Sequence, residues 1–145
     1  MLEQPAAEDV HLLSEYINTN NLPKLKEYLD YFHSSQSTSD LINFHDHEND
    51  TPLMKACVHG NLDIEKELIF NGAGVNISSL GITPLIKAIW YNRSETVSYL
   101  IELGANVNQC IEGLISSNYS PLMVAVELNR LDILRILLNA QANIN

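Results

Sequence analysis

The side chains best suited to chemistry stand together in one run, HDHEND at residues 45–50. A His-x-His pair beside carboxylates could bind zinc or another divalent cation. The spacing of the acidic residues also fits the start of a calcium-binding loop, but Thr51 replaces the glycine that such a loop requires and Cys57 replaces its closing glutamate. We therefore expect no bound metal and no cofactor, and keep a metal site at His45 and His47 as the less favoured alternative.

Other catalytic motifs are missing from the sequence. It has no nucleophile elbow, no phosphate-cradling glycine loop and no Cys-x-x-Cys pair. His59 could serve as a general base, but without a partner residue or a pocket it is better placed on a binding surface. We expect the chain not to be an enzyme.

The charge of the chain narrows the choice of partner. Its 145 residues include 18 acidic and 8 basic side chains, a formal net charge of −10, and 46% are hydrophobic. So acidic a surface repels nucleic acid and anionic lipid and favours a protein with a basic surface. No apolar run approaches the ~20 residues that a membrane-spanning helix needs. With no visible secretory signal and only two cysteines, we expect a cytoplasmic protein that binds protein, no nucleic acid and no membrane.

The elements that would position these residues recur along the chain. Three segments of equal length, residues 51–76, 83–108 and 120–145, begin 32 and 37 residues apart. Each begins with Thr or Ser, a good helix N-cap, and then Pro, which suits the first helical position. An apolar stripe follows, then a Gly or Asn that tolerates a left-handed turn, and then a second apolar helix. The repeated unit is therefore predicted to be helix, tight turn, helix and loop.

These motifs resemble those of the ankyrin repeat family, whose repeats start T-P-L-H-x-A and finish G-A-D-x-N. Here the starts are TPLMKA, TPLIKA and SPLMVA, and the finishes are GAGVN, GANVN and QANIN. The resemblance implies an all-α fold, an ankyrin-repeat solenoid of stacked helix-turn-helix units. It divides the single domain at residues 1–145 into a degenerate N-terminal capping repeat at 8–43 and repeats at 44–76, 77–108 and 109–145, the last with a longer finger loop. The serine-rich stretch from Ser34 to Asp40 is expected to be a loop insertion.

The chain departs from the family pattern at several positions. Met54, Ile86 and Met123 replace the histidine of the start motif, and Glu65 stands where the family usually has a buried valine. We therefore expect modest stability in the middle of the array. No polar C-terminal cap is visible after the last repeat, which favours the N-terminal part of a longer protein.

The resemblance also implies where a partner binds. Ankyrin proteins similar to this one dock partners on a concave surface made of the finger-loop tips and the exposed side of the first helix of each pair. Trp90 and Tyr91 are the strongest candidates, because Trp and Tyr are the commonest hot spots; alternatively, Trp90 packs under the long loop. By register, the candidate partner-binding residues are His47, Glu48, Asp50, Val58, His59, Leu80, Ile82, Trp90, Tyr91, Tyr119, Glu127 and Leu128.

Two details of the loops add to this picture. Asp46 matches the structural aspartate of ankyrin fingers, which is the simpler explanation for the acidic run. The long loop at 109–119 contains Ile111, Leu114 and Ile115, which need cover from either the domain or a partner.

The function implied by the resemblance is a protein–protein interaction module that acts as an adaptor, a targeting unit or an inhibitor. The alternative is the N-terminal ankyrin part of a longer enzyme, or of a bacterial host-directed effector that works in the host cytoplasm. The frequent isoleucine and asparagine favour an AT-rich genome, which is common among such bacteria.

Overall fold

The structure is a computed structural model that describes residues 5–33, 38–112, 119–140 and 142. Its regular elements in these ranges are helices, with two isolated antiparallel bridges at Ser79–Ile82 and Ile111–Tyr119. The chain forms two compact units, unit 1 at residues 1–74 and unit 2 at residues 75–145. The expected all-α fold is confirmed. None of the described helices has the length and apolar character to cross a membrane.

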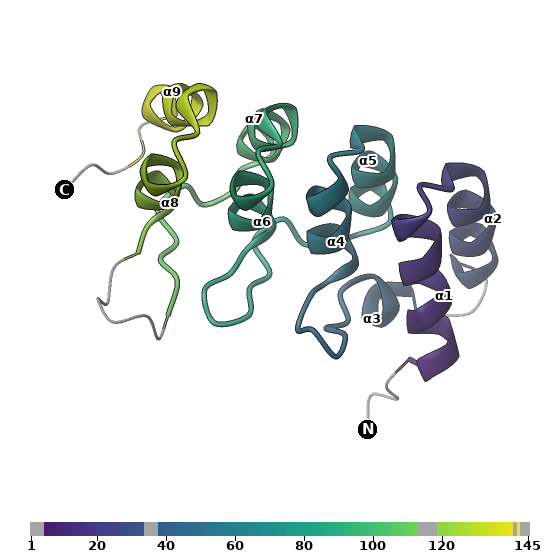
Figure 1. Cartoon of the computed structure of the whole chain (residues 1–145). Coiled ribbons are helices and arrows are strands. Elements are labelled where there is room, and N and C mark those ends of the chain that lie inside the picture. Colours follow the sequence, from purple (N-terminus) through teal and green to yellow (C-terminus); the bar gives the residue numbers. More distant parts are fainter. Residues whose placement is uncertain (1–4, 34–37, 113–118, 141, 143–145) are drawn as a thin grey trace. The chain divides into compact units, whose positions relative to one another are not determined.

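Unit 1 contains two helical hairpins and one short helix (Figure 1). Its helices are α1 (Ala7–Asn18), α2 (Leu22–His33), α3 (Thr38–Ile42), α4 (Pro52–His59) and α5 (Leu62–Phe70). Helix α1 packs on α2 and α4, and α2 packs on α5, so the hairpins lie side by side. The apolar stripes predicted from the sequence face each other between them, and Leu13, Leu25, Leu53, Ile64 and Leu68 are buried there.

Unit 2 repeats this arrangement with two hairpins (Figure 1). Its helices are α6 (Pro84–Trp90), α7 (Ser94–Glu102), α8 (Pro121–Glu127) and α9 (Leu131–Asn139). Helix α6 packs on α8 and α7 packs on α9. The first helices therefore form one layer of the unit and the second helices another.

Local chemistry sets where the helices begin and turn. The hydroxyl oxygens of Thr51, Thr83 and Ser120 each accept a hydrogen bond of 3.3 Å from the backbone N–H three residues later. The following proline has no N–H to satisfy at the first helical position. Each hairpin then turns at a left-handed residue, with φ of 71° at Gly60, 57° at Asn92 and 54° at Asn129. The predicted starts and turns are confirmed.

Two asparagines that close a repeat fasten it to the end of the next one. The Asn43 side chain donates to the Gly72 carbonyl at 3.0 Å and accepts from the Gly74 N–H at 2.8 Å. Asn76 makes the equivalent pair of bonds in unit 2, at 3.0 and 2.7 Å. The closing asparagine of the motif therefore has a structural role, because its side chain hydrogen-bonds to backbone groups that have no partner within the helix.

The prediction of a loop insertion from Ser34 to Asp40 is wrong in its last part, which is helical. Helix α3 begins at Thr38, so only the first part of the stretch, which lies outside the described residues, remains a predicted loop. The helix forms because Leu41 and Ile42 are buried against the unit, and packing of these two side chains overrides the polar composition before them.

Candidate protein-binding surfaces

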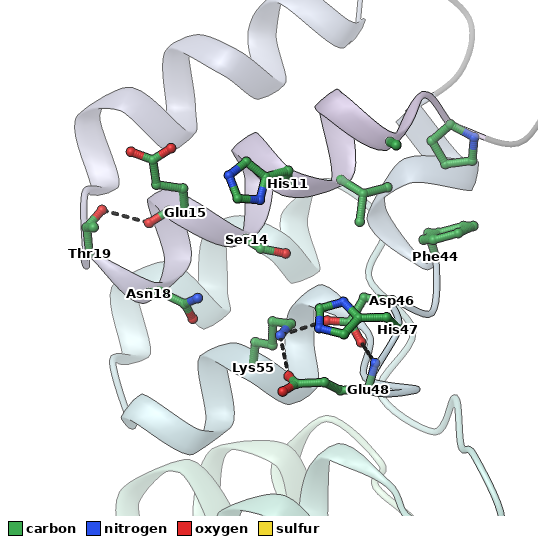
Figure 2. Close-up of a pocket in the computed structure, with 13 residues that line it drawn as sticks. His11, Ser14, Glu15, Asn18, Thr19, Phe44, Asp46, His47, Glu48 and Lys55 are labelled. Carbon is green, nitrogen blue, oxygen red and sulfur yellow. Dashed lines mark hydrogen bonds and ion pairs between the residues drawn. The ribbon is translucent and has the colours of Figure 1, made fainter.

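One hollow in unit 1 has the size of a ligand site. It has a volume of about 720 Å³ and lies between α1 and the loop that precedes α4 (Figure 2). Val10, His11 and Ser14 come from α1, and His47 and Glu48 come from the loop. We call this hollow the α1 pocket.

Asp46 holds the loop side of the α1 pocket in shape. Its Oδ1 accepts the backbone N–H groups of Glu48 at 2.8 Å and Asp50 at 3.0 Å, while Oδ2 lies 2.7 Å from Lys55 Nζ. Burial alone would raise the pKa of the Asp46 carboxyl, but Lys55 and the two backbone donors outweigh it and lower that pKa. Asp46 is therefore an ionised structural residue of the loop, as expected.

Lys55 joins this loop to α4. Its Nζ lies between Asp46 and Glu48, with Glu48 Oε2 at 3.0 Å, and only 12% of the lysine side chain is exposed. Burial disfavours the charged lysine, yet the two carboxylates raise its pKa overall, and Lys55 in turn lowers the pKa of Glu48. The three side chains therefore stay charged and paired at neutral pH.

The alternative of a metal site at His45 and His47 gains no support. Among the residues that the structure describes, no three His, Cys, Asp or Glu side chains are grouped so that they could hold a metal ion. Asp46, the carboxylate between these two histidines in the sequence, already accepts hydrogen bonds from the loop backbone and pairs with Lys55.

Unit 2 presents a second surface around its single tryptophan. Trp90 is half-buried at the end of α6, and Tyr91 next to it is 50% exposed. Arg130 Nη2 donates to the Trp90 carbonyl at 3.0 Å, and Lys87 Nζ lies 5.7 Å from the centre of the indole ring. We call Lys87, Trp90, Tyr91 and Arg130 the Trp90 face. It combines a half-buried indole, a more exposed phenol and two basic groups.

Comparison with known proteins decides the family. A family model described as ankyrin repeats (3 copies) matches residues 11–111, and a single ankyrin repeat model matches residues 117–145. The chain belongs to the ankyrin repeat family. Ankyrin repeats are generally protein–protein interaction modules and typically are not catalytic.

One curated relative is similar over most of this chain. A putative ankyrin repeat protein of fowlpox virus (strain NVSL) is 34% identical over 117 residues, which are 80% of this chain and 55% of the relative. The chain thus spans about half the length of the curated relative that it matches.

The predicted ankyrin finger residues of unit 1 fall into two groups. His47 and Glu48 are exposed and line the α1 pocket. Asp50 was expected at the loop tip, but it is buried, because Asp46 draws the Asp50 backbone inward and closes the turn. On α4, Val58 is half-buried and His59 is exposed, with its Nε2 3.2 Å from Asn18 Oδ1.

The ankyrin fingers of unit 2 are tied to each other. The Leu80 carbonyl accepts the Glu112 N–H at 2.8 Å, and the backbone of Cys110 lies so close to Gly81 that no side chain fits there. The Leu80 side chain is exposed, whereas the predicted residues Ile82 and Tyr119 are half-buried.

The remaining predictions for unit 2 concern α8 and the long finger. Glu127 and Leu128 are exposed, as the register predicts. Ile111 is buried, so the domain itself covers that apolar residue. Leu114 and Ile115 lie outside the described residues.

Sequence reasoning missed the α1 wall of the pocket. The missed residues include His11, Ser14 and Glu15, because the first ankyrin repeat lacks the Thr-Pro-Leu start that sets the register in the others. The buried Leu13 and Ile17 carry a signal that could have found them. Residues one or two positions from the buried stripe of an amphipathic helix, as these three are, lie toward its flank or its exposed side.

Proposed function

We propose that this chain binds a partner protein through its finger loops and first helices, and that it acts as an adaptor, a targeting unit or an inhibitor rather than as an enzyme. The observation that carries the proposal is the Trp90 face. Aromatic side chains that are fixed in place and still accessible bind with little loss of conformational entropy. Trp90 is half-buried with Lys87 near its ring, and Tyr91 is half-exposed, so both aromatic side chains are accessible to a partner.

The net charge of −10 supports a partner with a basic surface and works against nucleic acid and anionic membranes. We place the protein in the cytoplasm. The greater length of the viral relative supports a role as the interaction part of a larger protein. A larger enzyme or a host-directed effector would use the same surfaces for targeting.

A pull-down from cell lysate tests the proposal. Wild type is compared with the double variant Trp90→Ala/Tyr91→Ala. The control is Phe70→Ala, which removes an exposed aromatic side chain from α5 that does not line the α1 pocket. We expect at least one partner to be retained by wild type and by Phe70→Ala and lost from the double variant. A partner set that is the same for all three proteins, with circular dichroism showing that all are folded, would contradict the Trp90 assignment.

A further inference from the structure

We propose that the α1 pocket takes up a basic side chain, arginine or lysine, from a segment of the partner protein. This inference rests on the proposed function and specifies what the partner must offer to unit 1. Its volume of about 720 Å³ lies within the common range of ligand pockets. The pocket is therefore large enough for a long side chain and part of the peptide backbone that carries it.

The charges that line the pocket favour a cation. Three carboxylates line it, those of Glu15, Asp46 and Glu48, while Lys55 is the one Lys or Arg among the described lining residues. Lys55 Nζ forms ion pairs with Asp46 Oδ2 at 2.7 Å and with Glu48 Oε2 at 3.0 Å. With histidines counted as neutral, the lining carries more negative than positive charge, so an acidic or phosphorylated segment would be repelled.

Glu48 is the group best placed to receive the incoming charge. It contacts Lys55 through Oε2, and 60% of its side chain is exposed at the rim of the pocket (Figure 2). Because Lys55 keeps its pKa low, Glu48 is ionised at neutral pH. A guanidinium or ammonium group at the rim would share Glu48 with Lys55 through the second carboxylate oxygen.

The pocket also offers cover for the aliphatic part of such a side chain. Val10 and Ala7 of α1 lie on one side, and Phe44 lies on the loop side. Arginine and lysine bury their methylene stems on apolar surface while the charged head stays at a polar edge. Arginine and lysine can use both the apolar surface and the carboxylate at the rim. A short acidic side chain has no long stem for the first and the wrong charge for the second.

Small model compounds test this inference without knowledge of the partner. The probe is N-acetyl-arginine amide, titrated into ¹⁵N-labelled protein comprising residues 1–145 and followed by amide chemical shifts. N-acetyl-citrulline amide, which has nearly the same shape and no charge, is the matched ligand control. We expect saturable shifts at Ser14, His47 and Glu48 with arginine, and weaker shifts with citrulline.

Two variants complete the test. Glu48→Gln removes the charge at the rim and is expected to weaken arginine binding about threefold, the scale of an exposed ion pair. Glu95→Gln removes an exposed carboxylate from α7 in unit 2 and is expected to change nothing. Equal binding of arginine and citrulline, absence of saturable shifts in the α1 pocket, or full binding by Glu48→Gln would overturn the inference. None of these results bears on the Trp90 pull-down, so the two proposals can fail separately.

Discussion

At the scale of single residues, Asp46 shows how one loop side chain positions its neighbours. It fixes the loop backbone and Lys55, and thereby sets the position of Glu48 at the rim of the α1 pocket. The sequence predicted the structural role of Asp46 from its place in the motif. It did not predict the burial of Asp50, because that burial follows from how tightly the loop closes around Asp46.

The lowered pKa of Asp46 makes a prediction about acid stability. A carboxyl whose folded pKa lies below the ordinary value of 3.8 contributes stability that is present above that value. The contribution is lost as the pH falls through the lower folded pKa. We expect Asp46→Asn to reduce the free energy of unfolding at pH 7 by about 1–3 kcal/mol, the cost of breaking a charged hydrogen-bond network.

Urea unfolding of wild type and Asp46→Asn at several pH values measures this effect. The gap between the two proteins should narrow as the pH falls below 3.8. A gap that stays constant between pH 7 and pH 3 would show that the charge of Asp46 does not stabilise the loop.

The two cysteines are predicted to differ in reactivity. Burial raises the pKa of the Cys57 thiol well above its usual range, and the nearby Glu65 carboxyl raises it further. Cys110 is half-buried in the long finger. Since the thiolate is the reactive form, a chromogenic disulfide reagent should modify Cys110 in the folded protein and reach Cys57 only in denaturant. Rapid modification of both thiols without denaturant would show that the core around Cys57 opens readily.

At the scale of helices, equivalent positions in successive repeats differ in what covers them. Ile89 on α6 is completely buried, because α8 packs on α6. Val126 is the equivalent residue on α8 and is 60% exposed. The apolar pattern alone predicts burial for both, and only the neighbouring helix decides between them.

This difference gives a matched pair of substitutions. Ile89→Ala should lower the free energy of unfolding by about 2–4 kcal/mol, since it leaves a cavity in the core. Val126→Ala should change it by no more than about 0.5 kcal/mol, as is usual at exposed sites. Chemical denaturation of both variants and wild type provides the measurement. Similar losses for the two variants would mean that another surface covers Val126 in solution.

Helix boundaries could be predicted well because they depend on neighbouring residues. A Thr or Ser cap, a following proline and a left-handed Gly or Asn act within a few positions of one another. The α1 pocket could not be predicted in this way. It brings Ser14 and Glu48 together from two elements, and their proximity depends on how α1 packs against α4.

At the scale of the whole molecule, the chain combines an acidic net charge with two different local surfaces. The α1 pocket of unit 1 is acidic, whereas the Trp90 face of unit 2 is aromatic with Lys87 and Arg130 beside it. The sequence identified the family and the aromatic pair from local motifs. The contrast between the two surfaces emerged only when side chains from separate helices were placed together.

Hydrogen–deuterium exchange of the captured complex, compared with the free protein, tests whether the finger loops and first helices are where the partner docks. Binding should slow exchange in the loops at 44–50 and 78–82 and at Tyr91, because these backbone groups lose access to solvent. Second helices such as α5 and α7 should be unaffected. Slowed exchange confined to the second helices, with the loops unchanged, would contradict the proposed mode of binding.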